Sequence, residues 1–153
     1  EHGRFVVGAA FNPHIKNLAG AFLRLQKKIE AGADFVLTQP VYDRETIEII
    51  AENTSKMQVP VFIGVMPITS ARNAQFLHNE VPGIRLTEEV LKRMGKYPAA
   101  GPAARREGMD LARELIDSAL KHFRGIYLMT PFAYHDMTAE LTRQIKNKQP
   151  SRH

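Results

Sequence analysis

The stretch AGADFVLTQPVYD, residues 31–43, decides the fold. Its centre, Phe35 to Leu37, is a short continuous apolar run of the kind that forms a buried strand. Thr38 and Gln39 follow this run, and Pro40 comes next. Because proline has no N–H to donate to a neighbouring strand, we expect pairing to stop before Pro40. The stretch therefore predicts a buried strand over residues 34–38, with the carboxamide of Gln39 at its carboxyl end.

Three further apolar runs, residues 4–10, 59–66 and 125–129, have the same character. Amphipathic helical patterns separate the four runs. In the first pattern, the apolar residues from Leu18 to Ile29 recur at helical spacing and form one stripe. Three helical patterns lie between the last two runs, so the predicted order is β-α-β-α-β-α-α-α-β-α. Such alternation is typical of a parallel sheet covered by helices.

Small polar residues precede the first four helical patterns and are good N-caps. The candidates are Asn17, Asp43, Thr69 or Ser70, and Thr87. We expect Gly32 and Gly95 to follow the last turn of their helices, because glycine readily adopts the backbone conformation found there. The longest helix is predicted over residues 102–122 and the last over residues 134–146.

Two architectures combine parallel strands with helices in this way: an open doubly wound sheet and a (β/α)8 barrel. The first strand lacks the glycine-rich turn of a dinucleotide-binding open sheet. Each strand instead ends in a polar or proline-containing turn, where barrels carry their functional groups. A full barrel has eight strands in about 250 residues, whereas this chain of 153 residues supplies four. We predict an α/β fold: a partial TIM (β/α)8 barrel over residues 1–147, with a disordered tail over residues 148–153.

Composition narrows the classes of function. The net charge is +5, but Lys and Arg are spread along the helices, so we expect neither nucleic acid nor a membrane as a partner. No membrane-span or signal-peptide pattern is present, and the predicted location is the cytoplasm. The chain has no cysteine and no closely spaced histidine pair, so no metal site is expected. Asp110, Glu114 and Asp117 are interpreted as a solvated helix face paired with Arg and Lys of the same helix.

Three strand-end motifs resemble those of methylenetetrahydrofolate reductases. They are GAAFNPH (residues 8–14), AGADFVLTQPVYD (residues 31–43) and VPVFIGVMPITS (residues 59–70), and they occur in the family's order and spacing. The segment RNAQFLHNEVPGI, residues 72–84, is most similar to the bacterial branch in which the reductase follows a homocysteine S-methyltransferase domain. The resemblance covers residues 4–145 and implies the carboxy-terminal half of the family's barrel, strands five to eight.

The resemblance implies a site for FAD built from four residues. A family Gln at the end of this strand lies beside the flavin and binds the pterin ring of the folate; Gln39 matches it, and a carboxamide can both donate and accept. Phe11 stands where the family has an aromatic residue bordering the flavin. Lys28 matches a cofactor-contacting lysine; on helix position alone it is a solvated surface residue. His14 is either near a cofactor phosphate or a surface turn residue.

The resemblance also implies a folate-binding surface. Besides Gln39, Asn73 matches an amide that contacts the folate. Leu77, or Phe76 if the register shifts by one, stands where an aromatic ring stacks on the substrate or nicotinamide. The last strand lacks the arginine with which the family often binds the folate tail, since the equivalent stretch, residues 130–137, reads TPFAYHDM.

In the family, FAD takes a hydride from NAD(P)H and passes it to methylenetetrahydrofolate, which gives methyltetrahydrofolate for one-carbon and methionine metabolism. The two most important carboxylates belong to the half that this chain lacks, so we name no catalytic residue here. The expected partners are the remaining half of the barrel or a second copy. The alternatives are a non-catalytic flavin- or folate-binding or interaction module, and an unrelated phosphate-binding barrel half. The absent glycine-rich loop before the last helix disfavours the latter.

Overall fold

The computed structural model describes residues 5–148, which form four strands and six helices in the expected order. The strands are β1 (Gly8–Phe11), β2 (Phe35–Pro40), β3 (Val61–Val65) and β4 (Ile126–Leu128). The helices are α1 (Leu18–Glu30), α2 (Arg44–Thr54), α3 (Ala71–Glu80), α4 (Glu88–Gly95), α5 (Pro102–Ala119) and α6 (His135–Lys148). None of these helices is long and apolar enough to cross a membrane.

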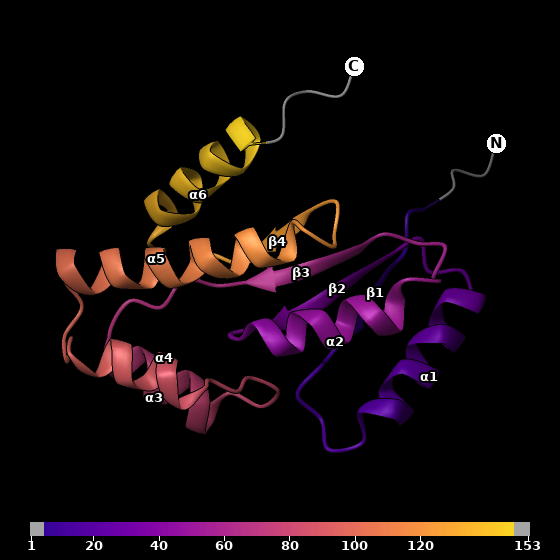
Figure 1. Ribbon diagram of the computed structural model, residues 1–153, viewed down its shortest axis with the longest axis horizontal. Helices are drawn as coiled ribbons and strands as arrows, with labels where there is room; N and C mark the ends of the chain where they lie inside the picture. The colour runs from indigo at the N-terminus through magenta and orange to yellow at the C-terminus, as the bar shows by residue number, and fades with distance from the viewer. Residues whose placement is uncertain (1–4, 149–153) are drawn as a thin grey trace.

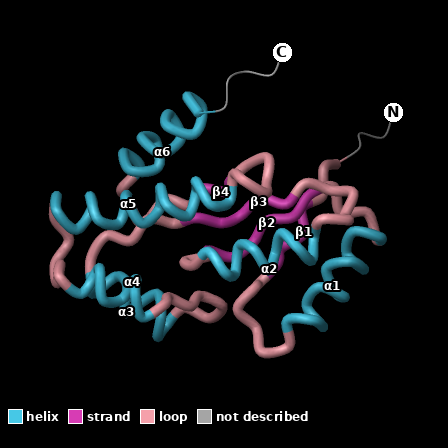
Figure 2. Tube along the Cα trace, in the orientation of Figure 1, coloured by secondary structure: helices cyan, strands magenta, loops and turns pink. Residues whose placement is uncertain are grey.

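The strands form one parallel sheet in which each strand pairs with the next along the chain, in the order β1-β2-β3-β4. The predicted α/β fold with four parallel strands is therefore confirmed. Helices α2 and α5 lie across the strands (Figure 1), and α6 lies outside them against α5 (Figure 2). Within residues 5–148, strands β1 and β4 each have a neighbour on one side only, so the described sheet has two free edges.

The two faces of the sheet differ in burial. Side chains on the helix-covered face, among them Val36, Ile63 and Val65, are almost fully buried. On the opposite face, Phe35 and Phe62 are only half-buried and their rings meet edge to face with centroids 6.3 Å apart. Tyr127, which pairs with Gly64 on this face, is exposed. The second face, here called the open face, is thus apolar and uncovered by the described residues.

The predicted N-caps are confirmed, with one of the two candidates before α3 selected, and one of the two predicted glycine positions is wrong. Asn17 accepts a hydrogen bond from Gly20 N at 2.8 Å, Asp43 from Thr46 N at 2.6 Å, and Thr87 from Val90 N at 3.3 Å. Of the two candidates before α3, Ser70 is the N-cap and Thr69 is not. Gly32 has φ +107° after α1, as expected of a residue beyond the last turn. Gly95 is the last residue of α4 rather than the residue beyond it, and Lys96 is the C-cap.

Pro40 does not stop the pairing of β2, which corrects the prediction. Pro40 stands opposite Gly64, and the register shifts between Leu37 and Pro40. Since Pro40 has no N–H, Val41 N takes over and donates to Gly64 O at 3.0 Å. The sheet accommodates the proline with one extra residue in β2, a β-bulge.

Helix boundaries differ modestly from the predictions. Helix α5 ends at Ala119, because residues 120–123 form a turn. Helix α6 extends through Lys148, whose ammonium contacts Asp117 Oδ1 at 2.6 Å. The remainder of the predicted tail, residues 149–153, lies outside the described residues.

Ion pairs join the helices of the outer layer. Arg93 of α4 contacts Glu107 at 2.6 Å and holds both carboxylate oxygens of Glu114 at 3.0 Å, and these carboxylates raise the pKa of its guanidinium. Asp110 pairs with Arg113 of its own helix, as predicted. Glu114 and Asp117 pair with other helices, so the acidic face of α5 is an interhelical contact as well as a solvated surface.

Candidate functional site

The carboxyl end of β2 presents Gln39 to solvent. Its side chain is exposed and makes no hydrogen bond within residues 5–148. Its neighbours Thr38 and Pro40 are buried on the other face of the sheet. The free amide can therefore donate and accept at the same time.

A cavity of about 260 Å³ lies between α1 and the ends of β1 and β2. It brings together Phe11, Lys28 and Gln39, three of the four predicted cofactor residues. Arg24 and Asn12 also line it, and no carboxylate of residues 5–148 does. Arg24 was not singled out in the sequence because a charged residue on a helix is indistinguishable from a solvated one until the strand ends are placed beside it.

Phe11 contributes mainly to the core. It is 4% exposed, and its ring lies 4.8 Å from that of Phe22, centroid to centroid, with the planes tilted by 31°. A ring so buried has little surface left for a ligand. The hydrophobic contact with α1 is its main interaction.

Lys28 is bound to the edge of the sheet. Its Nζ donates to the carbonyl oxygen of Ala10 at 2.8 Å. Alternate residues of a parallel strand direct their peptide groups to opposite sides. Val7 O accepts from Asp34 N, so the peptide groups of Val7 point towards β2. The peptide groups of Gly8 and Ala10 therefore point to the free edge of the sheet. The ammonium of Lys28 thus binds a carbonyl oxygen that no strand within residues 5–148 uses.

His14 joins the loop after β1 to the end of β2. Its Nε2 lies 3.0 Å from Pro40 O, and its backbone N donates to Asn12 Oδ1 at 2.9 Å. Because a carbonyl only accepts, Nε2 carries the proton in this contact. His14 is half-buried and adjacent to Gln39 through the backbone of Pro40.

Asn73 and Leu77 lie on α3 and do not line this cavity. Asn73 is buried, its Oδ1 accepts from Thr69 N at 3.1 Å, and its Nδ2 has no partner within residues 5–148. Leu77 is 5% exposed and packs in the core, whereas Phe76 is 49% exposed. The ring available for stacking on α3 is therefore that of Phe76.

The loop between α3 and α4 reaches the loop after β1. A Cβ placed on Gly83 would lie 2.5 Å from Asn12 Nδ2, so the two loops are in close contact. Tyr42, buried between the ends of β2 and β3, donates to Met66 O at 3.1 Å, and burial raises the pKa of its phenol. These contacts fix the loops at the carboxyl ends of the strands relative to one another.

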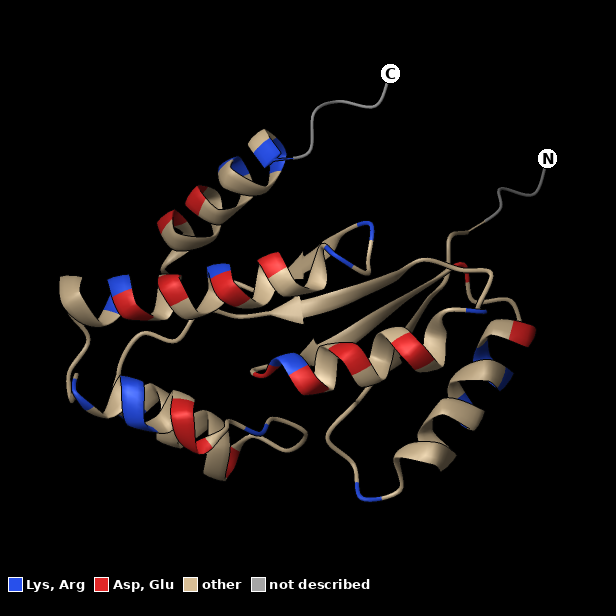
Figure 3. Cartoon of the chain, in the orientation of Figure 1, with Lys and Arg blue, Asp and Glu red and all other residues tan. Residues whose placement is uncertain are grey.

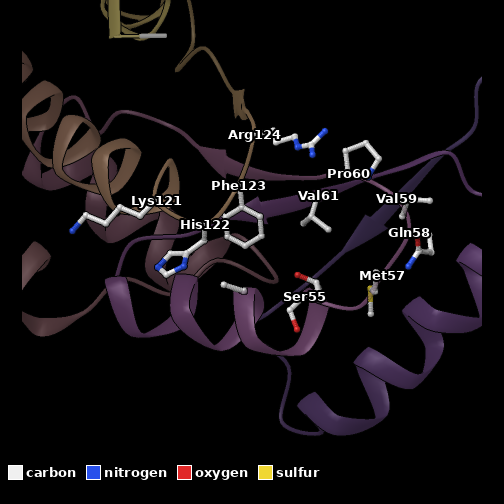
Figure 4. A pocket seen from close by; sticks show the side chains of 12 residues that line it. Ser55, Met57, Gln58, Val59, Pro60, Val61, Lys121, His122, Phe123 and Arg124 are labelled. Atoms are coloured by element: carbon white, nitrogen blue, oxygen red, sulfur yellow. The ribbon is translucent and has the colours of Figure 1, made fainter. Parts of the chain in front are cut away.

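A larger cavity, about 690 Å³, opens at the amino ends of β3 and β4 (Figure 4). Phe123, Met57 and Val61 form part of its lining, with Lys121 and His122 following the last turn of α5. Lys121, just beyond the carboxyl end of α5, complements the helix dipole there. In barrel folds this end of the strands serves stability rather than chemistry.

Charged residues are absent from all four strands and lie on the helices and loops, with both signs interspersed (Figure 3). In the described part of the chain, no three His, Cys, Asp or Glu residues are grouped as a metal ion would require. The polar side chains that line the cavity at the ends of β1 and β2 include the amide of Gln39 and the cations Arg24 and Lys28, which suit an aromatic, hydrogen-bonding and anionic ligand.

The family model described as methylenetetrahydrofolate reductase matches residues 6–146. The chain belongs to this family. The match includes Gln39 at the end of β2, Asn73 on α3 and all four strands. The resemblance seen in the three strand-end motifs is confirmed at the level of the family.

A solved structure with the same fold is that of an uncharacterized protein from Clostridium thermocellum that binds two copies of 5-methyl-5,6,7,8-tetrahydrofolic acid. The TM-score is 0.70 at 16% sequence identity, and the match covers 95% of this chain but 55% of the other. The chain thus spans about half the length of the solved structure it matches. At this identity the match shows the fold alone.

Proposed function

We propose that this chain supplies half of the FAD and folate site of a flavin-dependent reductase that converts methylenetetrahydrofolate to methyltetrahydrofolate. The observation that carries the proposal is the free carboxamide of Gln39 at the carboxyl end of β2, in a chain of the methylenetetrahydrofolate reductase family. A pterin ring offers donors and acceptors side by side, which an amide matches. The 5-methyltetrahydrofolate bound by the solved relative in fold supports a folate ligand.

The residues of the small cavity fit part of a flavin cofactor. Gln39 can bind a polar ring edge, while Arg24 and Lys28 can offset the charge of a diphosphate. The cavity is below the range of about 300–1,000 Å³ typical of whole ligand sites. FAD, when bound, supplies the hydride-transfer chemistry with NAD(P)H. The chain's own residues would bind and orient the cofactor and the folate.

The other half of the site comes from outside this chain. The open face of the sheet and its two free edges are the surfaces against which a complementary half barrel, or a second copy, would pack. The closed barrel would contain strands five to eight from this chain. The bifunctional bacterial reductases, in which a homocysteine methyltransferase domain precedes the barrel, are the family branch we propose for it, and the cytoplasm its location.

A non-catalytic flavin- or folate-binding fragment is the second candidate. The observation in its favour is that, among the residues that the structure describes, no Asp, Glu or His lines the cavity around Gln39. Without a proton donor the chain can hold ligands but cannot complete the reduction by itself. The two candidates differ in whether turnover appears when the complementary half is supplied.

Titration of the purified chain with FAD and, separately, with 5-methyltetrahydrofolate tests the proposal. We expect saturable quenching of flavin fluorescence and saturable folate binding by calorimetry. Replacing Gln39 with Leu should weaken folate binding about tenfold, which corresponds to the loss of one or two hydrogen bonds. The same replacement should weaken flavin binding less. Gln75→Leu, an exposed amide on α3 that makes no described hydrogen bond, is the matched control.

Two results would contradict the proposal. One is the absence of binding of either ligand even when the complementary half barrel is present. The other is equal weakening of folate binding in the Gln39 and Gln75 variants. Binding without turnover in the reconstituted barrel would favour the second candidate.

A further inference from the structure

The bulge at the end of β2 lies immediately before Gln39 and Pro40. Leu37 stands opposite Phe62 and Pro40 opposite Gly64, so three steps along β2 face two steps along β3. One residue of β2 is therefore extra. Bulges in sheets are frequent next to functional sites, where they re-aim a side chain.

The Thr38 hydroxyl holds this bulge. Gly64 N donates to Thr38 Oγ1 at 2.8 Å, where a regular ladder would offer it a backbone carbonyl. The hydroxyl in turn donates to the carbonyl oxygen of Gln39 at 2.8 Å. Thr38 is 2% exposed, so both bonds are shielded from water. One side chain thus ties the peptide of Gln39 to the backbone of β3.

Gly64 is the second part of the arrangement. A Cβ on this residue would lie 2.6 Å from Thr38 O and 3.0 Å from the carbonyl carbon of Gln39. Both atoms are backbone and cannot move aside cheaply. Only glycine lets β3 approach the bulge closely enough for its N–H to reach the Thr38 hydroxyl.

We propose that Thr38 is a positioning residue that sets the direction of the Gln39 carboxamide through the bulge. Thr38 does not touch the ligand, since it is buried on the helix-covered face and its hydroxyl donates to Gln39 and accepts from Gly64. The inference rests on the proposed function, in which Gln39 binds the folate. The inference explains why Thr38 of β2 and Gly64 of β3 lie next to Gln39.

The test compares Thr38→Val, which keeps the shape and removes the hydroxyl, with Thr38→Ser, which keeps the hydroxyl. Binding of 5-methyltetrahydrofolate is measured by calorimetry under conditions where both variants are folded, as checked by circular dichroism. We expect Thr38→Val to bind about tenfold more weakly and Thr38→Ser to bind within about threefold of the parent chain. A merely structural threonine would lower the unfolding midpoint of Thr38→Val without changing the affinity of the folded protein.

A second readout does not depend on ligand binding. Amide exchange of Gly64 and ¹⁵N relaxation of the Gln39 side-chain amide are followed by NMR in all three proteins. We expect faster exchange at Gly64 and a more mobile Gln39 amide in Thr38→Val, but not in Thr38→Ser. Unchanged Gly64 exchange and Gln39 mobility in Thr38→Val would overturn the inference, as would unchanged folate affinity.

The two proposals fail separately. If the parent chain binds no folate even in the closed barrel, the proposed function is wrong, and the NMR comparison alone decides the role of Thr38. If the parent chain binds folate and Thr38→Val binds it equally well, Thr38 has no positioning role while the proposed function stands.

Discussion

Gly108 shows how one absent side chain fixes the distance between a helix and a loop. It lies in the middle of α5, and a Cβ there would overlap the carbonyl oxygen of Ile68, in the loop after β3. The clash would be with backbone on both sides, so neither partner can yield without displacing an element. The loop that precedes α3 is thereby held against α5.

We expect Gly108→Ala to destabilise the chain by about 3 kcal/mol, because overpacking at a backbone contact forces α5 away from the loop. Urea unfolding followed by circular dichroism measures the change. Gly95→Ala is the control: Gly95 is also helical, but nothing lies within 4 Å of the added Cβ. That variant should be neutral or gain up to about 1 kcal/mol. Equal stability of the two variants would show that the close approach does not exist.

At this scale the sequence predicts what is local. Asn17 and Asp43 cap helices that begin in the next residue, and both were predictable because a cap and its N–H partner are three residues apart. The contacts of Gly64, Gly108 and Arg93 were not predictable. Their partners lie 14 or more residues away in the sequence and are brought near only by the fold. The sequence predicts that Gln39 lies at a strand end, but it does not predict that its side chain makes no hydrogen bond within residues 5–148.

At the scale of the elements, β1 is an edge strand whose free carbonyl at Ala10 is occupied by Lys28. Lysines on edge strands are a common protection against unwanted strand pairing. Here the ammonium must leave before another strand can add at this position. The cofactor role implied by the resemblance stays a prediction, and it is compatible with such release.

Replacing Lys28 with Met should therefore promote association through β1. Sedimentation velocity over a concentration series should show an apparent dissociation constant for self-association about fivefold lower than in the parent, which corresponds to about 1 kcal/mol. Lys27→Met is the control, since Lys27 is exposed on the same helix and its ammonium makes no described polar contact. A similar rise in association in both variants would indicate a general effect of lost charge and not protection of the edge.

Strand ends were harder to predict than strand centres. Pro40 was expected to end β2, since the rule that proline cannot donate is correct for the residue itself. The pairing continues because Gly64 of β3 permits the bulge, and Val41 N then donates to Gly64 O in place of the missing proline N–H. This could not be predicted from the sequence of β2 alone. Pairing across a sheet depends on both strands, so the sequence of one strand does not show where the pairing ends.

At the scale of the whole molecule, the sheet is open. The parallel order of its strands was predictable, because alternating apolar runs and amphipathic helices leave few topologies. Closure of the sheet into a barrel is not tested by the described residues, whose strands form an open sheet. Family membership and the 55% coverage of the solved relative are consistent with a larger unit, and the half barrel remains our interpretation.

Amide exchange should report whether the sheet is open in solution. Gly8 and Ala10 of β1, and Ile126 and Leu128 of β4, direct their N–H groups to the free edges and should exchange at least about tenfold faster than Ala9 and Tyr127. Protection of all four outward amides at low protein concentration would show that the edges are already paired. Protection that appears only after the complementary half is added would confirm closure by that half.

The sequential order of the strands has a consequence for how the chain acquires its structure. Each strand pairs with the one before it, so every newly synthesised βα unit finds its neighbour already present and needs no later insertion between existing strands. The sheet can therefore grow from β1 towards β4 while the polypeptide is still leaving the ribosome. The closures between β1, β2 and β3 are short, whereas residues 66–125, with α3, α4 and α5, separate β3 from β4 and make the last closure the longest. The last unit, the three-residue strand β4 with α6, should be the last to become protected in a pulse-labelled refolding reaction.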